Sequence, residues 1–278
     1  MNGETFWGRL VRYRSGRVGL VLVGIILLGA VAGPMLSPYD PETQDLELLE
    51  SPPSLAHPAG TDLLGRDLFT RLFYGARVSV GVGLMAALIA AGVGIFVGLA
   101  AGLAGGAVDW ILMRTVDVLL AFPRLVVVLL AVGFSTPSLG LTVVVLGLLS
   151  WMEVARIVRG EVLVVREALY VKSAIALGLS RGEIATRYVL PNVISPVIVS
   201  TALLVGTVIL VEATLSFLGL GVQPPHASWG TILNQGRIDP VGSWWISTFA
   251  GLLIVMTVVG VNLLADGLRE ATDPRRSR

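Results

Sequence analysis

The sequence predicts an all-α polytopic membrane protein with six transmembrane helices and both termini on the inner side (N-in and C-in). Composition is the first observation: hydrophobic residues make up 54% of the 278-residue chain and charged residues only 14%. Soluble proteins carry about 25% charged residues, so this chain has too little polar surface for a soluble domain. Long charge-free runs and a one-sided distribution of basic residues are the second and third observations.

The charge-free runs define the predicted spans, because a helix needs about 20 apolar residues to cross the hydrocarbon core. The second run is longer than one crossing requires, which indicates tilt or extension into the interfaces. A turn at 134–138 divides the third run into two helices. The six predicted spans lie at 18–36, within 78–108, at about 111–133 and 138–156, within 188–211 and within 241–265.

Orientation follows from the basic residues, which accumulate on the cytoplasmic side of membrane proteins. Sixteen of the 20 Lys and Arg residues fall on one side of the predicted spans, and the other four are Arg66, Arg71, Arg77 and Arg237. The alternative for the first run is a cleaved signal peptide, because basic residues precede it and residues 30–32 resemble a cleavage site. Cleavage would leave the later topology unchanged.

We divide the chain into an N-terminal unit (1–77), a five-helix core (78–270) with an inner loop at 156–187, and a tail (271–278). The outer loop 37–77 is acidic and rich in proline, and we expect it to be solvated. The second outer loop, 213–244, is apolar, so we expect it to lie at the membrane interface or to pack on the bundle.

The residue inventory predicts no catalytic or metal site. There are no cysteines, and the two histidines, His57 and His226, lie far apart in polar, proline-rich stretches. We interpret them as ordinary loop histidines. No nucleotide-binding loop of the Gly-x-x-x-x-Gly-Lys-Ser/Thr type is present, so we expect ATP to bind on another polypeptide.

Ionisable side chains near the predicted helix ends have two interpretations. A charge at the bilayer centre costs roughly 2.5–3.5 kcal/mol on insertion scales, and positions near the ends cost less. Pairing at the interface is favoured, with Arg156 three residues after Glu153 and Arg124 after Asp117. A role in a translocation path or gate is the alternative. The four residues are Asp117, Glu153, Glu212 and Asp266.

Small residues recur at steps of four in the second span, at Gly94, Gly98, Gly102 and Gly106. Such a stripe lets another helix approach closely, within this chain or in a partner subunit. The alternative is a hinge. We place Pro191, at the start of the fifth span, with these residues as a packing or hinge position.

The inner loop predicts two short helices that meet at a glycine. Residues 167–177 favour a helix, Gly178 suits the left-handed residue that ends one, and Ser180 with Glu183 forms a capping-box pattern. A helix lying on lipid would carry a basic face. We therefore expect the first helix to dock into a groove of another protein, through an apolar side formed by Leu169, Ala174, Ile175 and Leu177.

The inner loop resembles the Glu-Ala-Ala…Gly…Ile-x-Leu-Pro loop of bacterial ABC importer permeases. Four positions fit the pattern: Ala174, Gly178, Leu190 and Pro191. Three depart from it, since Lys172 replaces Glu, Ser173 replaces Ala and Tyr188 replaces Ile.

Motifs elsewhere extend the resemblance over nearly the whole chain. They are similar to the dipeptide/oligopeptide/nickel branch of these permeases, and within it to the C-type subunit. The motifs are His57-Pro58, Gly60-Thr-Asp-Leu-Leu-Gly-Arg-Asp67, Leu120-Ala-Phe-Pro123, Leu190-Pro-Asn192, Leu215-Ser-Phe-Leu-Gly-Leu-Gly221, Ser228-Trp-Gly230 and Asp266-Gly-Leu-Arg269.

This resemblance implies a type I ABC importer permease fold and a non-catalytic subunit. It implies a heterodimer with a second permease subunit, two cytoplasmic ATPase subunits that hold ATP and Mg, an external substrate-binding protein and no nucleic acid. Alternating access would move the substrate. The inner loop would be the coupling helix in the ATPase groove, comprising Ala168, Leu169, Tyr170, Lys172, Ser173, Ala174, Leu177, Gly178, Ser180 and Glu183.

The partner of Lys172, the substrate and the outer gate are further hypotheses. We hypothesise that Lys172 contacts a carboxylate of the ATPase. Di- or oligopeptides are the expected substrates, with nickel chelates, opines and glutathione as alternatives. An ion-gradient-driven secondary transporter and a membrane-embedded enzyme are the competing functions. The candidate outer gate or binding-protein contact comprises Phe217, Gly219, Gly221, Pro224, Pro225 and Trp229.

Overall fold

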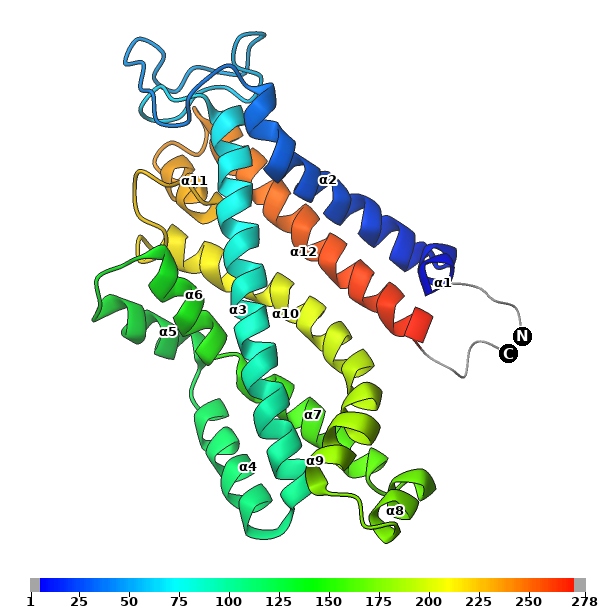
Figure 1. Ribbon diagram of the computed structural model, residues 1–278. Helices are drawn as coiled ribbons and strands as arrows, with labels where there is room; N and C mark the ends of the chain where they lie inside the picture. The colour runs from blue at the N-terminus through cyan, green and yellow to red at the C-terminus, as the bar shows by residue number, and fades with distance from the viewer. Residues whose placement is uncertain (1–5, 273–278) are drawn as a thin grey trace.

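A computed structural model describes residues 6–272, and within that range the chain is built from helices (Figure 1). The predicted tail from residue 273 onward lies outside the described residues. Five helices are long and apolar enough to cross a membrane. They are α2 (Arg14–Leu36), α3 (Leu68–Ala104), the consecutive α6 (Leu139–Leu148) and α7 (Trp151–Val165), α10 (Leu190–Phe217) with the turns before it, and α12 (Trp244–Thr272).

A sixth span exists only as a bent pair. Helices α4 (Gly106–Leu120) and α5 (Arg124–Gly133) meet at 80°. The prediction of one helix over 111–133 is therefore wrong in detail. Proline disfavours helical backbone at the residue before it, so Pro123 ends α4 and redirects the chain. Ser138 accepts a hydrogen bond from the Leu141 N–H (3.2 Å) and begins α6, as the predicted turn requires.

Helix α3 runs through the length of the molecule (Figure 1). Its 37 residues span about 55 Å at 1.5 Å per residue, more than the hydrocarbon core. Asp67 caps its first turn by accepting hydrogen bonds from Thr70 N (2.8 Å) and Thr70 Oγ1 (2.6 Å). The predicted loop to residue 77 is thus too long, because Arg71 and Arg77 interrupt the charge-free run without interrupting the helix.

The glycine stripe of α3 receives α7 from the same chain. A Cβ added at Gly98 would lie 2.6 Å from Val158 Cβ and 2.7 Å from the Ala155 carbonyl oxygen. Gly94 and Gly102 meet Val154 and Val162 in the same way. Gly106 lies beyond the end of α3 and meets nothing. The stripe is therefore a close helix contact within the chain.

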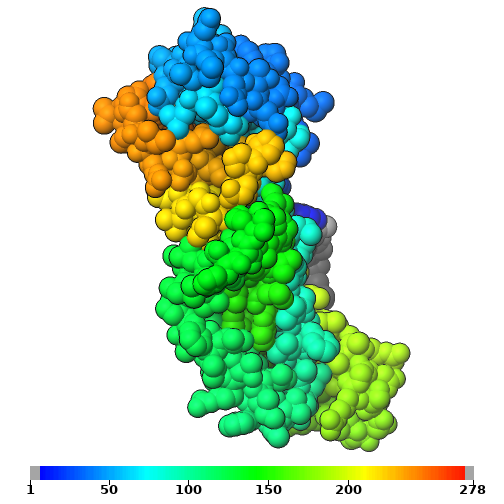
Figure 2. All heavy atoms as spheres, turned by 90° about the vertical axis from the view of Figure 1, so that its left-hand side faces the viewer, coloured from blue at the N-terminus to red at the C-terminus, as the bar shows by residue number. Residues whose placement is uncertain are grey.

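Two ends of the molecule carry the loops. We call the cap end the region formed by residues 37–67 and α11 (Trp229–Gly236), which join in one surface in Figure 2. We call the elbow the segment from α8 (Leu169–Ala176) through α9 (Arg181–Glu183), at the opposite end in Figure 1. The π-helix η1 (Ile184–Val189) joins the elbow to α10. Helix α1 (Phe6–Arg12) packs against α12 and α2.

We predict that Gly98→Ala lowers the stability of the protein and that Gly92→Ala does not. A methyl group at position 98 displaces α7, and such overpacking costs about 1–3 kcal/mol. Position 92, in the same helix, has nothing within 4 Å of the added Cβ. Removing a helical glycine there is neutral or stabilises by about 0.4–1 kcal/mol. The thermal unfolding midpoint in detergent measures both, and equal midpoints for the two variants would contradict the packing role.

Candidate functional site

A buried ion cluster holds the cap end together. The Asp62 side chain is fully buried, and its Oδ1 accepts hydrogen bonds from the backbone N–H groups of Leu64 (2.9 Å) and Arg66 (3.0 Å). Its Oδ2 accepts from Arg66 Nε at 2.8 Å and lies 2.7 Å from Arg66 Nη2. Arg71 Nε lies 3.2 Å from the same oxygen, without hydrogen-bond geometry. The expectation of a solvated loop therefore holds for residues 38–58, which are mostly exposed, and is wrong for Asp62 and Asp67, which are buried.

A second set of polar contacts fastens the loop to the helices. His57 Nδ1 lies 2.8 Å from Asp67 Oδ1, so this histidine supports the cap of α3. The Trp245 indole N–H donates to the Thr61 carbonyl oxygen (3.1 Å), which ties the loop to α12. Arg71 Nη1 donates to the Pro41 carbonyl oxygen (2.9 Å). These contacts hold the loop over the ends of α3 and α12, and we call residues 37–67 the lid.

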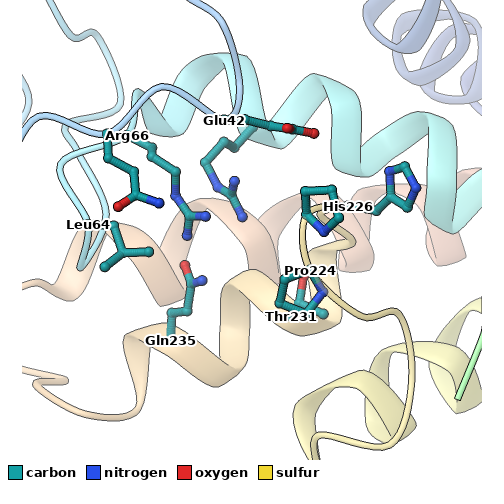
Figure 3. Close-up of a pocket in the computed structure, with 10 residues that line it drawn as sticks. Glu42, Leu64, Arg66, Pro224, His226, Thr231 and Gln235 are labelled. Atoms are coloured by element: carbon teal, nitrogen blue, oxygen red, sulfur yellow. The ribbon is translucent and has the colours of Figure 1, made fainter. Parts of the chain in front are cut away.

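A cavity of about 470 Å³ opens between this lid and α11. Glu42 and Arg66 lie on one wall, and Thr231 and Gln235 of α11 lie on the opposite wall (Figure 3). Arg71 and His226 also line it. The sequence reasoning placed Pro224 and Pro225 in the candidate outer gate but missed the rest of this lining, because the residues come from four segments of the chain. The one available signal was the Asp62–Arg66 pair at a spacing of four.

Glu212 anchors the segment between α10 and α11. Its side chain is fully buried, and its two carboxyl oxygens accept from Ser79 Oγ (3.0 Å) and Ser216 Oγ (2.7 Å). Ser79 Oγ in turn accepts from the Trp229 N–H (3.2 Å), and Ser216 Oγ accepts from the Val222 N–H (3.1 Å). One carboxyl group therefore holds both ends of the segment 218–228. Interfacial pairing with an arginine is therefore wrong for this position, and the alternative role in a translocation path or gate stays a prediction.

Some of the predicted outer-gate residues position the surrounding backbone, and others line the cavity. Trp229 is fully buried and donates its indole N–H to the Leu72 carbonyl oxygen (3.0 Å), so it positions α11 and offers no surface. Gly219 has φ +82°, and a Cβ at Gly221 would collide with Ser216. Phe217 packs under the Arg237 guanidinium. Pro224 and Pro225 line the cavity.

The elbow has the local structure that the sequence predicts. Gly178 has φ +81°, and the Leu179 and Gly178 N–H groups donate to the carbonyl oxygens of Ala174 (3.2 Å) and Ile175 (3.0 Å), which is the Schellman ending of a helix. Ser180 and Glu183 form the capping box at the start of α9. The π-helical turn that follows was not predicted. It ends at Val189, two residues before Pro191, which has no N–H to continue the regular hydrogen bonding.

One side of α8 faces the protein and the other is exposed. Val171 and Ala174 are buried, and the Tyr170 ring stacks on Tyr188 with 6.5 Å between centroids. Ala174 therefore belongs to the internal contact and not to the expected docking side. Leu169 and Leu177 are 83% and 81% exposed.

Lys172 has a partner within this chain. Its Nζ lies 3.0 Å from Glu167 Oε2, and both side chains are more than half exposed. The hydrogen bond from the Lys172 ammonium holds the pKa of Glu167 below its usual value. The Glu167 carboxylate is thus ionised at neutral pH, and both side chains remain exposed for a further partner.

Three ion pairs connect α4 and α5 to α7. Arg159 holds Asp109, Arg156 holds Asp117, and Arg124 Nη1 lies 3.4 Å from Glu153 Oε1. Pairing was predicted correctly for Asp117 and Glu153, but with the wrong partners. Glu153 does not use Arg156, because that arginine reaches across to α4. The pair with Asp109 was not predicted. Asp266 is exposed.

Comparisons with known proteins agree with this architecture. Residues 94–278 match the binding-protein-dependent transport system inner membrane component, and residues 3–53 match the N-terminal transmembrane domain of oligopeptide transport permease C. A putative peptide transport system permease protein of Brucella abortus is 44% identical over 270 residues, 96% of this chain and 90% of that protein. The dipeptide transport system permease protein DppC of Bacillus subtilis is 42% identical over 273 residues, 98% of this chain and 85% of that protein.

A solved structure shares the fold. The crystal structure of an amino acid ABC transporter with histidines covers 73% of this chain and 92% of its own, with a TM-score of 0.52 and 18% identity. The helices that are long enough to cross a membrane, together with the matched family models and relatives, define a polytopic permease of the ABC transporter class. The chain belongs to the family of inner membrane components of binding-protein-dependent transport systems. It is a multi-pass inner membrane protein and a permease subunit of an ABC importer.

We predict that Glu212→Leu loosens the segment 218–228 and that Glu212→Gln does so much less. Leucine leaves the Ser79 and Ser216 hydroxyl groups without their acceptor, and each buried unpaired group costs about 1–3 kcal/mol. Glutamine keeps one acceptor oxygen. Limited proteolysis in detergent measures cleavage within 218–228, with cleavage at the elbow as the internal reference. Equal rates for Glu212→Leu and the natural chain would show that the carboxyl group is not the anchor.

Proposed function

We propose that this subunit moves short peptides across the inner membrane by alternating access, along a path formed with a second permease subunit. The names of its relatives support the substrate class, since they include dipeptide, oligopeptide and glutathione transport permeases. An external binding protein would deliver the peptide. ATP and Mg would bind to two cytoplasmic ATPase subunits, because the sequence contains no nucleotide-binding loop.

The proposal that an ATPase binds this subunit rests on the exposed apolar side of the elbow. Leu169 and Leu177 project away from the protein, while Val171 and Ala174 fix α8 to η1. A short helix that is held rigidly from behind and apolar in front suits a groove in another protein. The elbow would then be the coupling helix, and the N-in, C-in topology would place it in the cytoplasm.

The connection from the elbow to the cap end supports alternating access. An ATPase can shift the bundle only through contacts that differ between its two states. Helix α9, η1 and α10 follow one another without a loop, so displacement of the elbow acts directly on α10. The far end of α10 carries Glu212, which holds the segment above it.

Purification from the native membrane in mild detergent tests the assembly. We expect two ATPase chains and a second permease chain to be recovered with the tagged subunit, and peptide uptake in reconstituted vesicles to require ATP and the binding protein. Recovery of this chain alone, active with an ion gradient and without ATP, would overturn the proposal.

We predict that Leu169→Arg combined with Leu177→Arg abolishes recovery of the ATPase and leaves the second permease bound. Two charges on this apolar side cannot be buried in a groove without a large desolvation cost. Leu55→Arg is the matched control, because Leu55 is fully exposed at the cap end. Quantitative mass spectrometry of the purified complexes gives the ratio of subunits. Undiminished ATPase recovery would exclude this face as the docking surface.

We predict that Lys172→Glu weakens the coupling of ATP hydrolysis to uptake, and that adding Glu167→Lys does not restore it. The double variant reverses the internal ion pair and so keeps it, but it removes the positive charge offered at position 172. The ATP hydrolysed per peptide transported in vesicles is the measurement. Full restoration in the double variant would assign Lys172 to the internal pair alone.

A further inference from the structure

The cavity at the cap end contains a buried cation in excess of its partners. Asp62 Oδ1 is occupied by two backbone N–H groups and Oδ2 by the Arg66 guanidinium. Arg71 is 2% exposed, and its one hydrogen bond within the described residues goes to the Pro41 carbonyl oxygen. Its Nε makes none. Two buried guanidinium groups thus share one buried carboxylate.

Glu42 is the remaining carboxylate at the cavity and is close enough to attract the Arg71 charge. It lies exposed on the rim, however, and among the described residues it forms no ion pair with Arg71, so the buried guanidinium has no second buried carboxylate beside it. A buried charge that lacks a full complement of partners is costly, so the arrangement favours an anion from outside. The planar guanidinium of arginine matches the two oxygens of a carboxylate.

The opposite wall offers a complementary group. Gln235 of α11 extends toward the cavity (Figure 3), and its Oε1 is buried without a hydrogen-bond partner. An unpaired buried carbonyl oxygen requires an N–H donor. The cavity volume of about 470 Å³ lies within the range of sites for small ligands.

We propose that this cavity binds a carboxylate group that has an N–H donor beside it, with Arg71 as the cation and Gln235 as the acceptor. The C-terminal residue of a peptide has this chemistry, since its carboxylate and amide N–H are joined to one carbon. An aspartate or glutamate side chain of a delivering protein also presents a carboxylate, one or two carbons further from its backbone N–H. The choice between these sources rests on the proposed function, whereas the carboxylate site itself does not.

The absence of cysteine allows a direct test on the full chain in nanodiscs, without partner subunits or ATP. Leu64→Cys places the only thiol on the lining of the cavity, and Leu55→Cys places it on the same loop in open solvent. Each thiol is labelled with an anionic sulfonatoethyl and a cationic trimethylammonioethyl methanethiosulfonate of similar size. The ratio of the two rates corrects for the different exposure of the two positions.

We expect the anionic-to-cationic rate ratio to be about tenfold or more higher at position 64 than at position 55, because a confined positive site concentrates anions. Arg71→Gln should bring the ratio at 64 down to the value at 55, and Arg71→Lys should keep it high. Asp62 retains Arg66 in both variants. Equal ratios at the two positions in the unmodified background overturn the proposal without any change at Arg71.

Protection by ligands identifies the source of the carboxylate. Dialanine should slow labelling at position 64 and not at 55, and dialanine amide should not slow it at either. Protection by dialanine alone assigns the site to a peptide terminus. Protection by N-acetylaspartic acid α-amide assigns it to an acidic side chain of a protein partner. Equal protection by dialanine amide, or no protection by either carboxylate, overturns the proposal. Because no transport is measured, failure here leaves peptide import standing.

Discussion

Close contact between α3 and its neighbours is the constraint on which the rest of the structure depends. Inside a bilayer the lipid is as apolar as the helix surface, so helices associate through tight packing and polar contacts instead of a hydrophobic effect. Gly94, Gly98 and Gly102 bring the backbone of α3 against α7, and Gly83 admits Ile209 of α10. Helices from both halves of the chain therefore take their positions from α3.

At the cap end, buried polar groups fix the positions of the segments relative to one another. Asp67 begins α3, Asp62 organises the lid, and Glu212 fixes the segment 218–228 to α3 and α10. Each carboxyl group is buried and satisfied by several donors, which makes the arrangement specific, because an alternative fold would leave these groups unpaired. The cap end is consequently held by several buried contacts, and within the described residues the Arg71 guanidinium has one hydrogen bond and shares its ion-pair partner with Arg66.

The sequence predicts those features that depend on neighbouring residues. The elbow follows from Gly178 and the Ser180–Glu183 spacing, because a left-handed residue and a capping box are local requirements. The spans follow from the apolar runs. The bend between α4 and α5 was missed although Pro123 signals it, because hydropathy alone was used to draw one helix across it.

Features made by segments far apart in the chain could not be predicted. The partner of Asp117 is Arg156 because α4 lies beside α7, and no spacing in the sequence indicates that arrangement. The same holds for the cavity, which is lined by Arg71 and Gln235, two residues that are more than half the chain apart in sequence. Residues 38–58 of the acidic loop are mostly exposed as expected, but composition does not reveal that Asp62 is enclosed by two arginines.

Helix α10 joins the two ends of the molecule, so a displacement at one end can reach the other end through this helix. The elbow is attached to the start of α10 through η1. The segment 218–228 is attached to the end of α10 through Glu212 and Ser216. A π-helical turn is a less regular element than the α-helix on either side of it. Bending at η1 would therefore absorb part of an elbow displacement, and the remainder would reach the cavity wall as movement of the segment that carries Pro224 and α11. A ligand in the cavity and a partner at the elbow would then each bias the same helix, which is the physical requirement for coupling between two sites.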